Sequence, residues 1–241
     1  MGERKQTMGR IGVLTVAYRE ETFIKNCISQ FKGRGYRHLV LICDSPWHGQ
    51  REEMDKTPDI CDEMGVEYVV SDWNTEAEMR NYGVSQLKDC DWILIVDADE
   101  RYEQSSLDKL ESFLGTAELS AYGIQTLYTY WKATNLVVDP KETGGLIVAV
   151  RPRVVFTDKR CIDSKWGFLH HEIVLHHFSY VRTDEQMKRK LETFEHYDEI
   201  VPNWYEEVWL KWTPDMINLH PTNPPSFHAV IRKELPGNVY V

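Results

Sequence analysis

The sequence has few cysteines and no arrangement of them that suits a disulfide framework or a zinc site. The five cysteines are an odd number, and no two of them form a CxxC pair. Such usage is typical of reduced, mostly buried thiols in the cytosol. We therefore expect a cytoplasmic protein without disulfide bonds.

Long hydrophobic runs and positive net charge are also missing. No apolar run approaches the roughly 18–20 residues that cross a membrane, and the first ten residues lack the apolar segment of a signal peptide. The net charge of −10 gives no general attraction to nucleic acid or anionic membrane. The 241 residues contain no repeat or low-complexity linker, which favours one α/β domain or one domain with an appendage.

The first hundred residues alternate strand and helix patterns regularly. Buried strands are predicted at residues 11–17, 38–43, 66–70 and 92–96. Strands separated by crossover helices imply a parallel sheet with right-handed connections, so we predict an α/β fold. Beyond residue 120 the pattern is less regular, with strands expected at 122–130 and 145–156. Thr183 and Gln186 form a capping box that begins a later helix.

Three carboxylates directly follow the fourth strand. The apolar run Trp92–Val96 leads into Asp97, Asp99 and Glu100. Charges in or near a core must be paired or bound to a cation, and Mg²⁺ typically sits on one or two carboxylates together with substrate phosphates. We therefore expect a divalent metal here. The alternative is that Asp97 and Asp99 only cap the following helix.

Polar side chains also follow the three earlier strands. Tyr18, Asp44 and Asp72 stand at these positions. In parallel sheets, ligands bind outside the carboxyl ends of the strands. Four separate segments should therefore meet at one crevice, which favours the metal hypothesis over helix capping.

Four segments, in this order, resemble the family-2 glycosyltransferases with the GT-A fold. They are Val16–Glu21, Leu41–Asp44, the "ARN-x-G"-like Ala77–Gly83, and the DxD motif Asp97–Asp99. The resemblance implies a single GT-A domain over residues 1–241, with a central, mostly parallel sheet flanked by helices. Residues 10–120 would bind the nucleotide sugar, and residues 121–241 would form a mixed acceptor-side half with a helical tail.

The same resemblance implies roles for single residues. Asp97 and Asp99 would hold Mn²⁺ or Mg²⁺, with His177 as a further ligand. Tyr18 would stack on the nucleotide base and Asp44 would accept the uracil imide N–H. The full set expected to contact the donor is Ala17, Tyr18, Glu20, Asp44, Arg80, Asp97, Trp166 and Lys190. The alternatives are a buried hydrogen-bonded His177, a core Trp166 and a solvated Lys190.

A second resemblance covers Arg151–Phe156 and Trp166–Glu172. It is to the branch of the family that adds sugars to lipopolysaccharide cores, which carries an "R-x-F … W-x-x-x-H-E … H" pattern. An inverting transfer needs a base for the acceptor hydroxyl, and the pattern implies Glu172 for this role. Asp163 is the alternative base.

The predicted function is metal-dependent inverting transfer of a sugar from a nucleotide donor, most simply a UDP-sugar, by an enzyme of the hexosyltransferase type (EC 2.4). Nucleotidyltransferases usually carry a glycine-rich loop after the first strand, whereas residues 15–22 contain no glycine. Phosphatases with a nucleophilic Asp in a DxD loop normally carry it on their first strand, whereas Asp97 follows the fourth. A non-catalytic carbohydrate-binding protein on the same fold stays an alternative.

The acceptor is open between a glycan, a protein, a small molecule and modified nucleic acid. Five basic residues between positions 151 and 165 could guide an anionic acceptor. They are Arg151, Arg153, Lys159, Arg160 and Lys165. A solvated strand–loop surface is the alternative interpretation.

Overall fold

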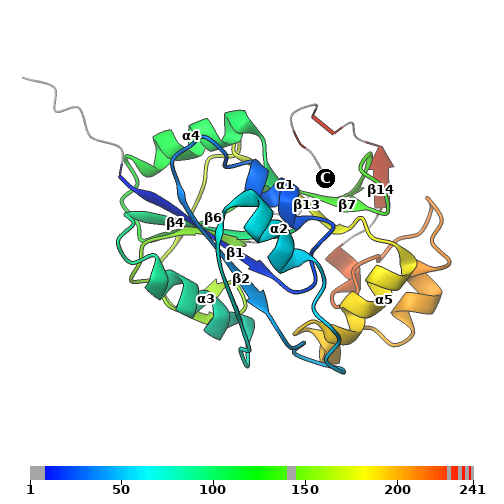
Figure 1. Cartoon of the computed structure of the whole chain (residues 1–241). Helices are drawn as coiled ribbons and strands as arrows, with labels where there is room; N and C mark the ends of the chain where they lie inside the picture. The colour runs from blue at the N-terminus through cyan, green and yellow to red at the C-terminus, as the bar shows by residue number, and fades with distance from the viewer. Residues whose placement is uncertain (1–8, 140–144, 227–228, 233–234, 237–238, 240–241) are drawn as a thin grey trace, which may run out of the picture.

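The computed structural model describes residues 9–139, 145–226, 229–232, 235–236 and 239. Its centre is a seven-stranded sheet of order β12-β6-β9-β4-β1-β2-β3 (Figure 1). The strands are β1 Ile11–Ala17, β2 Arg37–Cys43, β3 Glu67–Ser71, β4 Trp92–Asp97, β6 Ala121–Gly123, β9 Ile147–Val150 and β12 Gly167–Phe168. Strands β1 to β4 are parallel, while β9 runs antiparallel to β4. The predicted α/β fold with a mostly parallel sheet is thus confirmed.

Helices cover both faces of this sheet. They are α1 Ile24–Ser29, α2 Thr57–Met64, α3 Glu76–Gln86 and α4 Gln104–Leu114. Successive side chains of a strand point to opposite faces. Accordingly Leu14 of β1 packs with α3, whereas its neighbour Val13 packs with α1 and α4. Both faces of the central strands are therefore buried, which explains their unbroken apolar sequences.

A second sheet begins after the turn that carries Asp97 and Asp99. Its order is β14-β8-β7-β13-β5, with β5 Glu100–Tyr102, β7 Thr126–Trp131, β8 Leu136–Asp139, β13 Val174–Tyr180 and β14 Ala229–Arg232. Strand β5 begins three residues after the end of β4, so the turn through Asp97 and Asp99 joins the two sheets. The sheets therefore meet at the predicted DxD motif.

Two predicted strands differ from the observed ones. The strand expected at 122–130 is divided, because the chain passes from β6 in the first sheet to β7 in the second. The strand expected at 145–156 ends at Val150, close before Pro152, which has no N–H to donate to a strand partner. The chain continues into the hairpin of β10 Phe156–Asp158 and β11 Cys161–Ile162.

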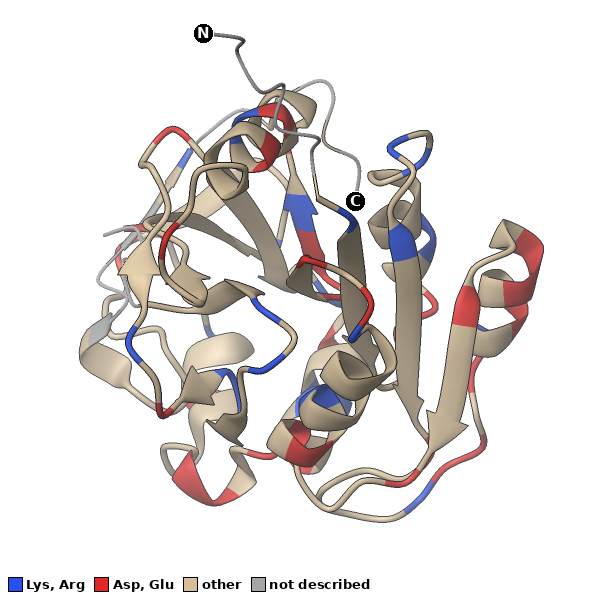
Figure 2. Cartoon of the chain, turned by 90° about the vertical axis from the view of Figure 1, so that its left-hand side faces the viewer, with Lys and Arg blue, Asp and Glu red and all other residues tan. Residues whose placement is uncertain are grey.

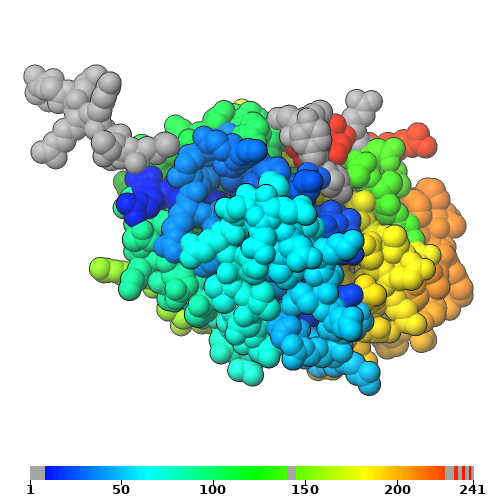
Figure 3. All heavy atoms as spheres, in the orientation of Figure 1, coloured from blue at the N-terminus to red at the C-terminus, as the bar shows by residue number. Residues whose placement is uncertain are grey.

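The C-terminal part packs against the second sheet. Helix α5 Asp184–Thr193 begins with the predicted capping box, in which Thr183 and Gln186 exchange hydrogen bonds of 3.0 and 3.2 Å. The tail continues through the short helices η1 Tyr197–Glu199, η2 Tyr205–Trp209 and η3 Pro224–Ser226. A buried cluster that includes Trp131, Trp204 and Leu219 joins the tail to β7 and β13. Figure 3 shows α5 and the tail, in yellow and orange, seated against the blue and cyan first half.

Within the described ranges, no helix is long and apolar enough to cross a bilayer. All five cysteines are free thiols, and only Cys161 is exposed. Pro140, Phe227 and His228 lie outside the described residues.

Candidate active site

A cavity of about 530 Å³ lies over the carboxyl ends of β1 and β4. Its lining includes the end of β1, the β4–β5 turn, the start of α3, the β10–β11 hairpin, and residues of β13, α5 and the tail. This is the edge of the sheet at which the sequence predicts a crevice.

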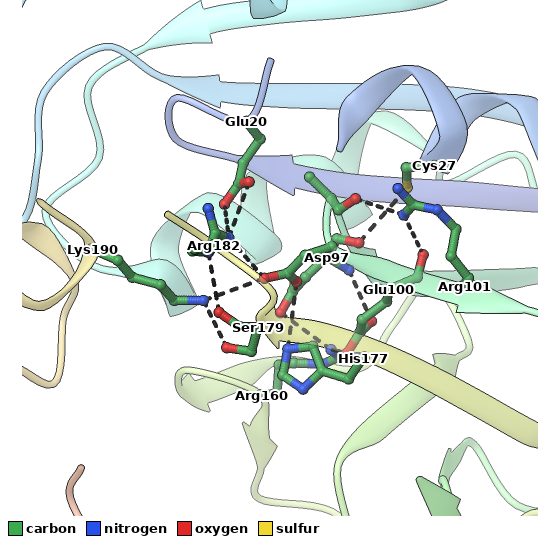
Figure 4. Close-up of polar contacts among 12 residues, drawn as sticks. Glu20, Cys27, Asp97, Glu100, Arg101, Arg160, His177, Ser179, Arg182 and Lys190 are labelled. Carbon is green, nitrogen blue, oxygen red and sulfur yellow. Dashed lines mark hydrogen bonds and ion pairs between the residues drawn. The ribbon is translucent and has the colours of Figure 1, made fainter. Parts of the chain in front are cut away.

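Asp99 stands at the centre of an ion-pair network in this cavity. Its Oδ2 lies 2.9 Å from Arg182 Nη2 and 3.3 Å from Lys190 Nζ. Its Oδ1 lies 3.4 Å from His177 Nε2. Figure 4 shows the side chains of His177 from β13, Lys190 from α5 and Arg182 from the segment between them pointing toward one another. Burial opposes the ionisation of Asp99, but Lys190 and His177 overcome it and hold the pKa of its carboxyl well below the usual value.

Asp97 belongs to a different set of ion pairs. Its two carboxylate oxygens face Arg80 Nη2 at 2.9 Å and Arg160 Nη1 at 3.3 Å. Burial raises its pKa, yet the two arginines, Arg160 first, bring the pKa below the usual value. Glu100 is fully buried, contacts Arg160 Nη1 at 2.6 Å and accepts the backbone N–H of Asp97 at 2.9 Å. Glu100 and Arg160 therefore stabilise the β4–β5 turn from its buried side.

The helix-capping alternative does not describe these carboxylates. Helix α4 begins only at Gln104, and its N-cap residue is Glu103, which makes no side-chain capping bond. Asp97 is the last residue of β4, and Asp99 precedes β5. Both carboxylates are instead satisfied by cationic side chains from other elements.

The donor atoms near Asp99 fit a cation that arrives with a phosphorylated ligand. Among the described residues no three His, Cys, Asp or Glu side chains are arranged to hold a metal. Asp99 Oδ1 and His177 Nε2 are 3.4 Å apart, and neighbouring ligands of one octahedral ion at about 2.1 Å are separated by about 3 Å. Two protein ligands suit Mg²⁺ or Mn²⁺, because such ions usually keep water and substrate phosphates as their other ligands.

The carboxylate of Asp99 also shifts the pKa of His177. Burial lowers its pKa, but the charge and hydrogen bond of Asp99 outweigh burial and raise the pKa above the usual value. A metal ligand must be a neutral imidazole, so a bound cation would favour the unprotonated form of the His177 ring.

Six of the eight residues expected to contact the donor line the cavity: Ala17, Tyr18, Glu20, Arg80, Asp97 and Lys190. Asp99 and His177, which were expected to hold the metal together with Asp97, line it too. Glu20 accepts two hydrogen bonds from Arg182 Nη2, at 2.8 and 3.1 Å. Its carboxylate therefore orients the guanidinium that also contacts Asp99.

Four other predicted site residues do not line the cavity. Asp44 pairs with Arg51 at the end of β2, and Asp163 is exposed beyond β11. Trp166 packs on Gly145, where an added Cβ would lie 2.7 Å from the indole. The side chain of Glu172 is 54% exposed and lies 3.5 Å from Lys109 of α4. A general base must lie within hydrogen-bond reach of the acceptor hydroxyl. The assignment of Glu172 or Asp163 as base is therefore a sequence prediction that this geometry does not support.

Several cavity residues escaped the sequence analysis. Arg182 precedes the capping box of α5, where sequence gives no sign that it reaches Asp99. Trp47 lies beside Tyr18, with ring centroids 6.5 Å apart. Its buried Nε1 has no hydrogen-bond partner in the described part of the chain. His220 comes from the tail, in which no motif was recognised.

The basic residues between 151 and 165 do not form one patch. Arg160 is buried against Glu100, and Arg151 lies over the Trp92 ring at 4.0 Å. Lys159 pairs with Glu199 at 2.8 Å. Figure 2 shows Lys and Arg interspersed with Asp and Glu along the chain. These basic residues therefore do not form the contiguous positive surface that was expected to guide an anionic acceptor.

A parallel sheet with a DxD turn at the end of β4 and a cavity over it defines a transferase fold of the GT-A type. The chain belongs to glycosyl transferase family 2, because the sequence model of that family matches residues 12–173. The match ends just before β13. His177, Arg182, Lys190 and His220 therefore lie beyond it.

Several solved structures are similar to parts of the chain. One is glucosyl-3-phosphoglycerate synthase from Mycobacterium tuberculosis with Mn²⁺, UDP and glucosyl-3-phosphoglycerate, at 14% identity and a TM-score of 0.43. The alignment covers 60% of this chain and 57% of the synthase. Another is TarS of S. aureus, at 14% identity and a TM-score of 0.46, with 76% of this chain and 40% of TarS covered. Comparison with the curated proteins gives no match.

Proposed function

We propose that the protein transfers a sugar from a nucleotide donor to an acceptor hydroxyl, with a divalent metal held at Asp99 and His177. The observation that carries this proposal is the cavity over β1 and β4, in which Asp99 meets Arg182, Lys190 and His177. A UDP-sugar is the donor that the sequence resemblance favours.

Arg182 and Lys190 would bind the diphosphate. Both cations now contact Asp99 Oδ2, and each has a second partner that fixes its position. Glu20 holds Arg182, and Ser179 Oγ accepts from Lys190 Nζ at 2.8 Å. Donors fixed in advance need no reorganisation when negative charge develops on the leaving group. When bound, Mn²⁺ or Mg²⁺ would add charge neutralisation at the same oxygens.

The nucleotide base would lie at the end of β1. Tyr18 and Trp47 supply aromatic surface there, and Trp47 Nε1 supplies an unused N–H. The sequence prediction of uridine rests on Asp44 as the imide acceptor. Asp44 pairs with Arg51 and does not line the cavity. The identity of the nucleotide base therefore has to be measured directly.

Thermal unfolding with a panel of nucleotides tests donor binding. We expect UDP with Mn²⁺ to raise the midpoint more than GDP or ADP at equal concentration, since a ligand that binds the native state stabilises it by mass action. Stronger protection by ADP or GDP would replace uridine as the base. Protection by none of the three would contradict the proposed function.

Cys161 offers a test of where the donor binds. It lines the cavity and is exposed, whereas the other four thiols are buried. Under native conditions we expect a thiol reagent to modify one cysteine per chain, and the Cys161→Ser variant to lose that reaction. UDP-glucose with Mn²⁺ should slow the modification in proportion to occupancy. An unchanged rate at saturating ligand would place the binding site elsewhere.

A further inference from the structure

Six carboxylate side chains line the cavity, and four of them are used on both oxygens. The residues that line it are Glu20, Glu21, Asp55, Glu76, Asp97 and Asp99. In four of these, both oxygens face a hydrogen-bond donor or a cation: Glu20, Asp55, Asp97 and Asp99. Glu21 is exposed, accepts the backbone N–H of Lys56, and follows Tyr18 at the end of β1 where the base would bind. The sixth carboxylate, Glu76, is placed differently.

Glu76, the first residue of α3, is held in place by a buried arginine. Its Oε2 accepts a hydrogen bond from Arg80 Nη1 at 2.5 Å, and its backbone N–H donates to Glu195 at 3.2 Å. The side chain is only 21% exposed, but Oε1 is accessible. No described residue donates a hydrogen bond to this second oxygen. The carboxylate is therefore fixed through one oxygen and has the other available to a ligand in the cavity.

The same arginine links Glu76 to the β4–β5 turn. Arg80 Nη2 lies 2.9 Å from Asp97 Oδ1, so one guanidinium bridges the two carboxylates. Asp97 is two residues from Asp99, where the metal and the diphosphate would bind. The transferred sugar is bonded directly to the diphosphate and so must begin close to this turn. Glu76 therefore belongs to the part of the cavity that the sugar would enter.

We propose that Glu76 Oε1 accepts a hydrogen bond from a hydroxyl of the sugar carried by the nucleotide donor, and thereby determines which sugar is bound. The proposal deepens the proposed function and rests on it. An ionised carboxylate can only accept hydrogen bonds, so it attracts hydroxyl groups and repels phosphate oxygens. Hydrogen bonds to an ionised group are about twice as strong as neutral ones, and a few placed polar groups suffice to orient a ligand in a pocket.

A substitution of similar shape tests this role. Glu76→Gln removes the charge and keeps the size of the side chain. Glu78→Gln, the matched control, removes the same charge from an exposed residue of α3 that does not line the cavity. Dissociation constants for UDP, UDP-glucose, UDP-galactose and UDP-N-acetylglucosamine, all with Mn²⁺, are measured by calorimetry. Deoxy analogues of the preferred donor, each lacking one sugar hydroxyl, then identify the group that Glu76 contacts.

We expect Glu76→Gln to weaken binding of the preferred UDP-sugar about 10- to 100-fold, the worth of one hydrogen bond to a charged group. UDP binding should stay unchanged or become slightly tighter, because a negative charge leaves the cavity. One deoxy donor should bind the unmodified protein as weakly as the full donor binds Glu76→Gln, and the two losses should not add. Glu78→Gln should behave as the unmodified protein does.

An equal ratio of UDP-sugar affinity to UDP affinity in Glu76→Gln and the unmodified protein would show that Glu76 only holds Arg80, and the proposal would be wrong. Losses that add for every deoxy donor would also overturn it. Should Glu76→Gln bind no UDP, Glu76→Asp replaces it in the same comparison, since it keeps the charge beside Arg80 and withdraws it by one methylene. Failure of the unmodified protein to bind UDP or any of the UDP-sugars would instead contradict the proposed function.

Discussion

Asp97 and Asp99 are two residues apart in the sequence but have different neighbours. Asp97 is held on both oxygens by Arg80 and Arg160, which leaves it little capacity to bind a ligand. Asp99 uses Oδ2 for Arg182 and Lys190, whereas its Oδ1 faces His177. The difference indicates that Oδ1 of Asp99 is the atom that would bind a metal.

Removing this oxygen's charge should weaken metal binding strongly. We expect Asp99→Asn to lower the Mn²⁺ affinity of the UDP complex at least about tenfold, since even residues that only orient a metal ligand are worth that much. Electron paramagnetic resonance of free Mn²⁺ measures this directly. Asp163→Asn, an exposed carboxylate outside the cavity, is the matched control. Equal Mn²⁺ affinity in the two variants would remove Asp99 from the metal site.

Glu172 provides a second test at the residue scale. Because its side chain is exposed and lies beside Lys109, we expect Glu172→Gln to transfer sugar at nearly the unmodified rate. Loss of a general base costs roughly 10²–10⁴ in rate, so the two outcomes are easily told apart by steady-state assay. A loss in that range, at unchanged thermal stability, would restore the sequence prediction and place the acceptor over this surface.

Helix α3 packs closely on β1 at Gly83, where the absence of a Cβ leaves room for Leu14. A Cβ added at Gly83 would lie 2.6 Å from Leu14 Cδ2, inside the sheet–helix layer. The "ARN-x-G"-like segment therefore serves packing at Gly83 and charge at Arg80, whose guanidinium reaches Asp97. The close packing of α3 on β1 therefore helps to place the guanidinium of Arg80 within ion-pair distance of Asp97.

We expect Gly83→Ala to destabilise the protein by up to about 2 kcal/mol, since overpacking costs about 1–3 kcal/mol and better helix propensity returns up to about 1 kcal/mol. In a Leu14→Val background, which lacks the δ carbons, the same change should be neutral or stabilising. Urea unfolding of the four proteins in this cycle gives the coupling. Additive effects would show that Leu14 is not the obstacle.

The elements were predictable where their sequence pattern is local. β1 to β4 and the capping box of α5 follow from apolar runs and from side chains three residues apart. The division of residues 122–130 between two sheets was not predictable from the sequence. It depends on pairing of β6 with β9 and of β7 with β13, and these partners lie far along the chain. For the same reason Arg182 and His220 could not be assigned to the cavity, while Asp99 and Lys190 could.

At the scale of the whole molecule, the half-buried His38 of β2 links stability to pH. Burial lowers the pKa of His38 to about 4, and its Nε2 lies 2.8 Å from Thr15 Oγ1 between β1 and β2. The unfolded chain, with a histidine pKa of about 6.5, binds more protons than the folded protein between these two values. The free energy of unfolding should therefore fall as pH decreases from about 6.5 to about 4.

Between pH 7.5 and 5.0 this linkage amounts to about 2 kcal/mol for one such histidine. We expect the unmodified protein to lose about that much more stability over this interval than His38→Gln, as measured by urea unfolding at both pH values. Parallel losses in the two proteins would show that His38 is protonated in the folded state.

The cavity is proposed to hold a nucleotide sugar together with a divalent metal at Asp99. The most direct measurement is nucleotide release from a panel of UDP-, GDP- and ADP-sugars, with Mn²⁺ and with excess EDTA. We expect release from a UDP-sugar that needs Mn²⁺ and is lost in Asp99→Asn protein that remains folded. Release that continues at the same rate in EDTA, or in Asp99→Asn, would contradict it.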